Sequence, residues 1–177
     1  MKFPKPAFDE LLLHYKVSPE SVHDCPRIYR KDLGLDLNTS ALRMTEALML
    51  ANRLVESHAA IASLTSAGGS GKSFLLGRYG YKANLCPHGI ARGAADVVYF
   101  LKDQWGRPTH NWRDLEPYAR GTLPEVVQQT LGDKTGLIAF LKIDGHDGQG
   151  HLDLWEKKKA VGTTYPTARK IMFWMLE

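Results

Sequence analysis

The sequence contains no apolar stretch long enough to cross a membrane. Its longest uninterrupted apolar run, Ile171–Leu176, is far shorter than the roughly 20 residues that a membrane-spanning helix needs. Near the start of the chain, Asp9 and Glu10 stand where a secretory signal peptide would carry its apolar core. We therefore expect a soluble protein that is made in the cytoplasm without a signal peptide and has no membrane partner.

Cysteine is scarce, and the sequence has neither internal repeats nor low-complexity segments. The two cysteines, Cys25 and Cys86, exclude a dense disulfide framework. They form either one bridge or two separate thiols, and two free thiols are the default expectation. With 177 residues, of which 44% are hydrophobic and 24% charged, the chain fits a single folded domain, residues 1–177.

The net charge is weakly positive, which favours an anionic partner without identifying it. Lys and Arg number 23 and Asp and Glu number 19, which gives +4 at pH 7. Nucleic acid, acidic lipid and the carboxylate-rich bacterial wall all fit this charge. The basic cluster Lys157–Lys159 has only three charges and no accompanying ladder of aromatic residues, so we interpret it as a solvated hairpin tip. We therefore expect no nucleic-acid partner.

Apolar residues at helical spacing predict helices in the first two thirds of the chain. In residues 41–56 the apolar side chains form one stripe, and Arg43 and Glu46 lie largely off it. A second stripe covers residues 93–105, and the Gly and the Pro that follow it indicate the end of this helix. Two shorter helices are expected at residues 8–15 and 124–131.

The last third of the chain has the pattern of an antiparallel sheet. Residues 137–143 form an apolar run of strand length, residues 151–156 alternate after a glycine-rich turn, and residues 171–176 form a third run. We expect these three strands to make an antiparallel meander. The predicted fold is therefore α+β, with N-terminal helices packed on a C-terminal antiparallel sheet.

Ser40 lies where a loop enters the helix expected at residues 41–56. It stands four residues before Met44 on the apolar stripe, so its side chain should face the core. At a helix start, the first N–H groups and the positive end of the dipole stabilise an anion, including the oxyanion of acyl transfer. Ser40 is thus a candidate nucleophile, and the alternative is that Asn38, Thr39 or Ser40 only caps the helix.

The segment Gly150–Trp155 places a histidine beside an acid. On a strand, His151, Asp153 and Trp155 share one face, and the two leucines between them lie on the other. An acid beside a histidine fixes its tautomer and stabilises its charged form. Because such pairs are commonly ordinary hydrogen bonds, this pattern alone does not identify a catalytic base.

Three segments, taken in order along the chain, carry a resemblance to a known family. They are Asn38–Thr45 (NTSALRMT), Arg92–Pro108 with its Trp-Gly-Arg-Pro ending, and Gly136–Trp155 with its GHLDLW motif. From about Leu37 onward the chain resembles the fourth family of type VI secretion amidase effectors. The resemblance implies a papain-like, NlpC-type fold and an enzyme that cuts the bond between D-glutamate and meso-diaminopimelate in peptidoglycan stem peptides.

The resemblance also implies how such a protein is used. Effectors of this family are delivered by type VI secretion machinery into the periplasm of a rival bacterium, and a cognate immunity protein holds them in check. The implied partners are therefore peptidoglycan stem peptides, the secretion machinery and an immunity protein, with no cofactor and no metal.

The chain departs from the family at the nucleophile and at the third site residue. The family has a cysteine where this chain has Ser40, and a site shaped for sulfur should lose most of its rate with a hydroxyl. We expect an inactivating Cys-to-Ser substitution, with a natural variant as the alternative. His151 is the implied general base. The resemblance implies that an acidic residue beyond the Leu-Trp pair orients this histidine. Because Lys157–Lys170 contains no Asp, Glu, Asn or Gln, Asp153 is the local candidate for this role.

Other patterns support competing interpretations. Ser66–Ser73 is one residue short of a phosphate-binding P-loop, but no convincing strand precedes it, so we favour a flexible loop. A non-catalytic protein that binds wall peptides with a dead site is a further alternative. One turn-rich stretch contains five potential metal ligands: Asp144, His146, Asp147, His151 and Asp153. Their spacing matches no zinc motif, so we interpret the stretch as a polar hairpin turn.

Overall fold

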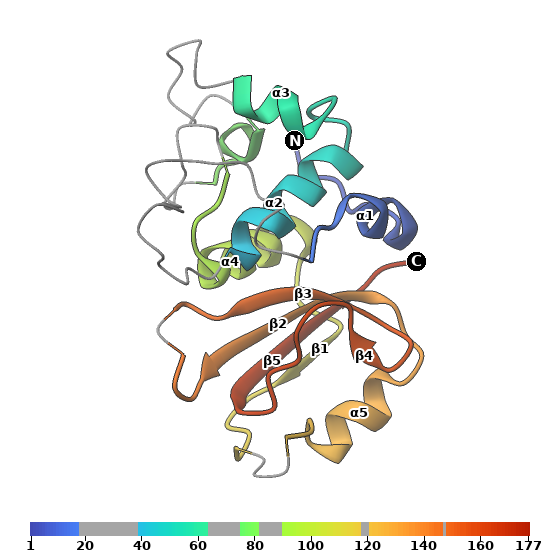
Figure 1. Cartoon of the computed structure of the whole chain (residues 1–177), viewed down its shortest axis with the longest axis vertical. Coiled ribbons are helices and arrows are strands. Elements are labelled where there is room, and N and C mark those ends of the chain that lie inside the picture. The colour runs from blue at the N-terminus through green and yellow to red at the C-terminus, as the bar shows by residue number, and fades with distance from the viewer. Residues whose placement is uncertain (18–38, 64–74, 82–89, 118–120, 147) are drawn as a thin grey trace.

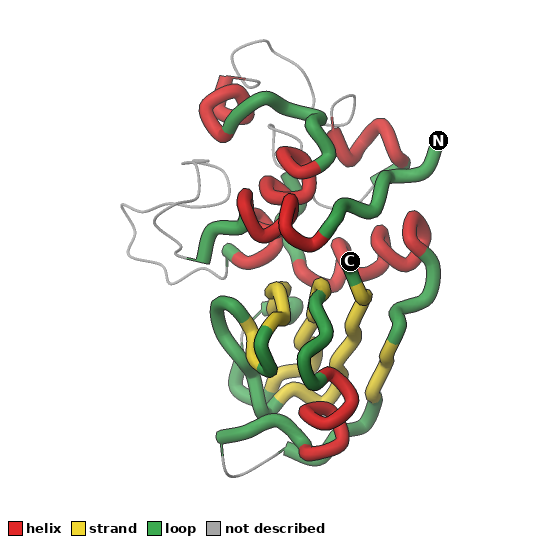
Figure 2. Tube along the Cα trace, turned by 90° about the vertical axis from the view of Figure 1, so that its right-hand side faces the viewer, coloured by secondary structure: helices red, strands yellow, loops and turns green. Residues whose placement is uncertain are grey.

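A five-stranded antiparallel sheet carries the C-terminal half of the chain, and helices pack on both of its faces (Figure 1). The computed structural model describes residues 1–17, 39–63, 75–81, 90–117, 121–146 and 148–177. Figure 2 shows that most helices gather on one side of the sheet and that α5 lies on the other. The helices are α1 (Phe8–His14), α2 (Ser40–Ala51), α3 (His58–Ser63), α4 (Ala94–Trp105) and α5 (Glu125–Leu131), with a 3-10 helix, η4, at Leu75–Tyr79.

The strands run in the order β1-β5-β2-β3-β4. Their bounds are β1 (His110–Trp112), β2 (Gly136–Ile143), β3 (His151–Glu156), β4 (Lys159–Ala160) and β5 (Ala168–Met175). The three predicted strands are confirmed as antiparallel, but the meander is wrong, because β5 pairs with β2 and not with β3. Strands β1 and β4 were not predicted, since two or three residues are too few to show alternation.

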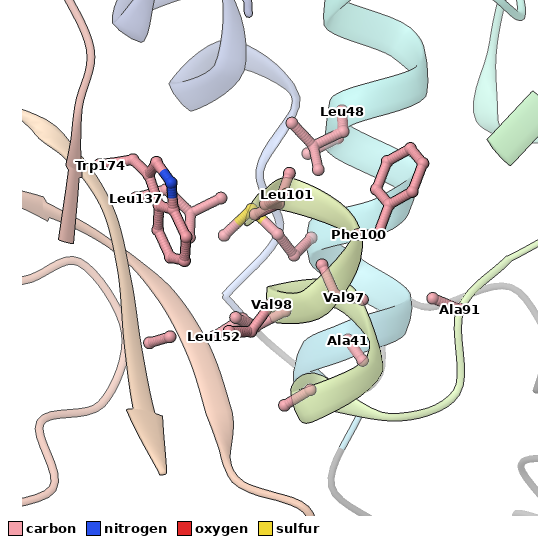
Figure 3. Close-up of a cluster of buried hydrophobic side chains, with 14 of the residues drawn as sticks. Ala41, Leu48, Ala91, Val97, Val98, Phe100, Leu101, Leu137, Leu152 and Trp174 are labelled. Atoms are coloured by element: carbon pink, nitrogen blue, oxygen red, sulfur yellow. The ribbon is translucent and has the colours of Figure 1, made fainter. Parts of the chain in front are cut away.

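Apolar side chains fill the space on both sides of the sheet. On one side, Leu137 and Leu152 pack with α1, α2 and α4, and Figure 3 shows Val98 and Leu101 of α4 lying close to them. On the other side, Phe140 and Trp155 pack with the buried residues of α5. The predicted α+β arrangement of N-terminal helices on a C-terminal antiparallel sheet is confirmed.

Helix α2 is buried on all sides. Every residue from Ser40 to Leu50 is buried, including Arg43 and Glu46, which lie largely off the apolar stripe. The helix also ends earlier than predicted, at Ala51, because the Asn52 side chain donates to the carbonyl of Leu48 at 3.0 Å and the next residue turns left-handed. The helix that begins at the candidate nucleophile is therefore a central element of the core.

The remaining predicted helices agree with the structure to within one residue at their ends. Residues 8–15, 93–105 and 124–131 correspond to α1, α4 and α5, whereas α3 and η4 were not predicted. Glycines flank α4 at both ends, with Gly93 as its N-cap and Gly106 as its C-cap, where φ is +85°. Within the described residues, none of the helices combines the length and the apolar character needed to cross a bilayer.

Candidate active site

Ser40 is the first residue of α2, and its side chain points into the protein. It is fully buried, and its Oγ accepts a hydrogen bond of 3.2 Å from the backbone N–H of Leu152 in β3. The predicted core-facing direction is therefore confirmed. The preceding residue, Thr39, makes no side-chain cap bond to the helix, and its Oγ1 instead accepts from Arg43 Nε at 3.1 Å.

His151 and Asp153 form a buried pair on the strand that meets Ser40. Their side chains lie on one face of β3, as predicted, and His151 Nε2 is 3.0 Å from Asp153 Oδ2. The carboxylate also accepts three backbone N–H bonds, from Leu154 at 2.8 Å, Gly162 at 3.0 Å and Thr163 at 2.7 Å. Asp153 is thus held rigidly in one orientation by its own strand and by the loop that follows β4.

This geometry leaves one imidazole nitrogen as an acceptor. Because a carboxylate only accepts hydrogen bonds, the pairing with Asp153 assigns the proton to His151 Nε2 and the lone pair to Nδ1. In the described part of the chain, Nδ1 is buried and has no hydrogen-bond partner. A buried lone pair of this kind can take a proton from a nucleophile that comes within hydrogen-bond distance of it.

The imidazole ring of His151 is held by packing as well as by its hydrogen bond to Asp153. The ring of Tyr165 lies against it with centroids 4.8 Å apart, and Phe140 lies on the neighbouring strand at 6.4 Å. Gly150, which precedes the histidine, has φ +130°, and an added Cβ would lie 2.5 Å from the carbonyl oxygen of Phe140. The backbone at the start of β3 therefore requires a glycine immediately before His151.

Tyr15 and Arg43 lie next to the pair, and neither was predicted as a site residue. The Tyr15 hydroxyl donates to the carbonyl of Leu152 at 3.2 Å and accepts from Arg43 Nη1 at 3.4 Å. Burial, followed by the negative charge of Asp153, raises the pKa of Tyr15 far above its usual value. Only the fold brings these residues together, because Tyr15 and Leu152 are 137 positions apart.

The other candidate groups of the sequence are placed elsewhere or are not described. Asp144 binds Arg169 through two bonds of 2.9 Å, and this guanidinium lowers the pKa of the carboxyl group. His146 packs edge-on against Tyr165. No three His, Cys, Asp or Glu side chains within the described ranges are grouped to hold a metal. Five predicted features lie outside the described residues: Cys25, Asn38, Ser66–Ser73, Cys86 and Asp147.

The basic cluster occupies the predicted hairpin tip. Lys157 and Lys158 form the turn between β3 and β4, with φ of +49° and +66° and exposed side chains. Lys158 Nζ lies 3.8 Å from the exposed Asp133, and Lys157 Nζ lies 3.4 Å from the half-buried Glu156. The cluster is a solvated turn, on the far end of β3 from His151.

Comparison with solved structures shows proteins with the same fold. The type VI effector Tae4 from Enterobacter cloacae, in its complex with Tai4, matches with a TM-score of 0.59 and 19% identity, over 98% of this chain and 100% of that one. Tae4 from the same organism without its partner gives 0.59 and 18% over the whole of both chains. Tae4 from Salmonella typhimurium, bound to the Tai4 of Enterobacter cloacae, gives 0.58 and 14%, over 98% and 100%.

No protein-family model matches the chain, and no curated protein matches it. The structural matches extend over nearly the entire chain, so the chain has the overall fold of these proteins. At these identities the likeness establishes the fold, and the chemistry has to be argued from the site itself.

Proposed function

We propose that this chain is an antibacterial type VI effector built as a peptidoglycan amidase, with its nucleophile at residue 40. The observation that supports the proposal is the hydrogen bond that Ser40 Oγ accepts from the N–H of Leu152, the residue between His151 and Asp153, whose side chains are themselves paired. The fold shared with Tae4 effectors supports the same assignment. The proposed architecture is papain-like and NlpC-type.

The proposed reaction is acyl transfer to residue 40 followed by hydrolysis. His151 Nδ1 takes the proton from the nucleophile, whose sulfur or oxygen then attacks the carbonyl carbon of the amide. The N–H of residue 40, at the positive end of α2, stabilises the oxyanion. The imidazolium returns its proton to the leaving amine, and a water molecule then releases the acyl group and regenerates the enzyme.

We further propose that serine at position 40 is an inactivating replacement for cysteine. A thiol beside an imidazole at a helix start forms a thiolate near neutral pH, whereas a serine hydroxyl ionises far less readily. The His151–Asp153 pair and the bond from Leu152 to the side chain of residue 40 support a nucleophile at this position. As written, the chain would bind its substrate and cut it slowly or not at all.

The proposed substrate is the bond between D-glutamate and meso-diaminopimelate in peptidoglycan stem peptides. The net charge of +4 suits a wall rich in carboxylates. The proposed partners are a cognate immunity protein and the type VI secretion machinery, and the proposed place of action is the periplasm of the target bacterium. Pairing of the neighbouring Tae4 structures with Tai4 supports the immunity partner.

A wall-hydrolysis assay with two variants tests this proposal. Purified peptidoglycan is incubated with the chain as written, with Ser40→Cys and with Ser57→Cys, which adds a thiol at an exposed serine. We expect Ser40→Cys alone to release peptides that end at D-glutamate, identified by mass spectrometry. Equal activity in all three proteins, or none in any, would contradict the proposal. Binding without cleavage by Ser40→Cys would instead favour a wall-peptide-binding protein.

A further inference from the structure

Side chains, rather than a neighbouring strand, bind both polar backbone groups of Leu152. Its N–H donates to Ser40 Oγ and its carbonyl accepts from the Tyr15 hydroxyl, each at 3.2 Å. Strand β4 pairs only with Trp155 and Glu156, so it does not reach this part of β3. Leu152 lies between His151 and Asp153, so these two bonds hold the backbone that carries the catalytic pair.

Arg43 connects Tyr15 back to the helix that carries the nucleophile. One turn after Ser40, its guanidinium donates to the Tyr15 hydroxyl, to the carbonyls of Lys16 and Val17 at 3.0 and 2.7 Å, and to Thr39 Oγ1. Arg43 is only 6% exposed, and within the described residues no carboxylate lies at ion-pair distance from it. A buried charge satisfied by carbonyl and hydroxyl oxygens is a rigid structural link.

These contacts form a closed circuit of four residues. The circuit runs from Ser40 to Leu152, then to Tyr15, then to Arg43, and returns to Ser40 along α2. Burial, followed by the charge of Asp153, raises the pKa of Tyr15, so its hydroxyl keeps its proton and remains a donor to the Leu152 carbonyl. A circuit of this kind fixes the position of α2 relative to the start of β3.

We infer that Tyr15 and Arg43 are positioning residues, which set the placement of residue 40 against the imidazole of His151 by holding the carbonyl of Leu152. The inference deepens the proposed function and rests on it. Neither residue needs to touch substrate, because each acts through the strand that bears the catalytic pair. Loss of the Tyr15 hydroxyl should therefore lower the rate of the chemical step and leave substrate binding unchanged.

The test removes one oxygen atom in the Ser40→Cys protein. Tyr15→Phe is compared with Tyr81→Phe, since Tyr81 is equally buried and its hydroxyl has no partner within the described residues. We expect Tyr15→Phe to lower kcat by about tenfold with KM unchanged, whereas Tyr81→Phe changes neither. The result that overturns the inference is a loss of thermal stability alone, with kcat matching the Tyr81→Phe control.

A second readout does not depend on the substrate. Iodoacetamide alkylation of the thiol at position 40, followed as a function of pH by mass spectrometry of its peptide, reports whether an imidazole stabilises the thiolate. At pH 6 we expect Tyr15→Phe to react about tenfold more slowly than the Tyr81→Phe control. If Ser40→Cys reacts fast at pH 6 but does not cut peptidoglycan, the proposed function fails and the positioning can still be measured.

Arg43→Lys provides the second variant in case Tyr15→Phe does not fold. It keeps the charge, but a single ammonium cannot reach every acceptor that the guanidinium binds. We expect the same loss in the pH 6 alkylation rate, in a protein that still unfolds cooperatively. An alkylation profile identical to that of the parent would overturn the role of Arg43.

Discussion

Two histidine–carboxylate pairs in the described part of the chain have the same separation and different surroundings. His151 and Asp153 lie 3.0 Å apart, as do His58 and Glu46. The side chain of His151 is 4% exposed and that of His58 is 29% exposed. The first pair lies beside a candidate nucleophile, whereas the second connects α2 to α3.

The difference between the pairs shows that a contact between a histidine and a carboxylate is not enough to make a candidate catalytic site. Asp153 is fixed by three backbone N–H donors, and the other nitrogen of its histidine is buried with no partner in the described chain. His58 has a pKa lowered mainly by burial, with Glu46 acting in the opposite direction. The first pair has the arrangement of a general base, and the second has that of a structural link.

The largest expected effect comes from removing each histidine in the Ser40→Cys protein. His151→Gln should lower kcat by about a thousandfold, because a positioned general base contributes roughly 10²–10⁴ in rate. His58→Gln should change kcat by less than about twofold and mainly lower stability. Steady-state hydrolysis of wall fragments measures both, and comparable losses in the two variants would refute the assignment of roles.

The second comparison exchanges each carboxyl group for an amide. Asp153→Asn should lower kcat by about a hundredfold, since the amide no longer fixes the imidazole tautomer that leaves Nδ1 basic. Glu46→Gln keeps the shape of the other pair and should leave kcat within about twofold. An intact rate in folded Asp153→Asn would show that another group orients His151.

Glycine substitutions test how rigidly Asp153 is held. An added Cβ at Gly162 would lie 2.7 Å from Asp153 Oδ2, and one at Gly93 would lie 2.0 Å from Gln149 Oε1. Gln149 is exposed and can swing away, whereas the Asp153 carboxylate has four N–H partners. We expect Gly162→Ala to lower kcat by about tenfold and Gly93→Ala to leave it unchanged.

The smallest effect concerns pH and the second pair. The pKa of His58 in the folded protein is below its ordinary value of about 6.5, so the unfolded chain binds the proton first as pH falls. Its contribution to stability is therefore complete above about pH 6.5 and is lost as pH decreases toward the folded pKa. Urea unfolding at pH 7.5 and 5.5 should show a smaller decrease in midpoint for His58→Gln than for the parent chain.

The elements that carry the site could be predicted because their patterns are local. The apolar stripe placed α2 and α4, and alternation placed β3 with His151 and Asp153 on one face. The bounds of α2 were less accurate, because the Asn52 side chain ends the helix by bonding Leu48 and Pro4. The order of the strands could not be predicted, because β5 does not pair with β3 or β4, the strands immediately before it in sequence, but lies on the other side of β2 from β3.

The surroundings of the His151–Asp153 pair could not be predicted, because they are made by distant segments. Tyr15 reaches Leu152 from the first helix, and the N–H groups of Gly162 and Thr163 reach Asp153 from a loop with no motif. Arg43 lies largely off the apolar stripe of its helix, and its own burial could not be predicted, since a buried arginine is the exception. Its burial is evident only once the 15–17 segment supplies carbonyl partners.

The burial of α2 on every side has a consequence for when the protein can act. Residue 40 opens a helix whose sides are all in contact with the rest of the molecule, so no surface flap can swing this residue into place. The imidazole becomes its neighbour only when the interior closes as one cooperative event. Residue 40 and the imidazole would thus be separated in any partly unfolded form of the chain, and only complete refolding would reassemble the candidate site.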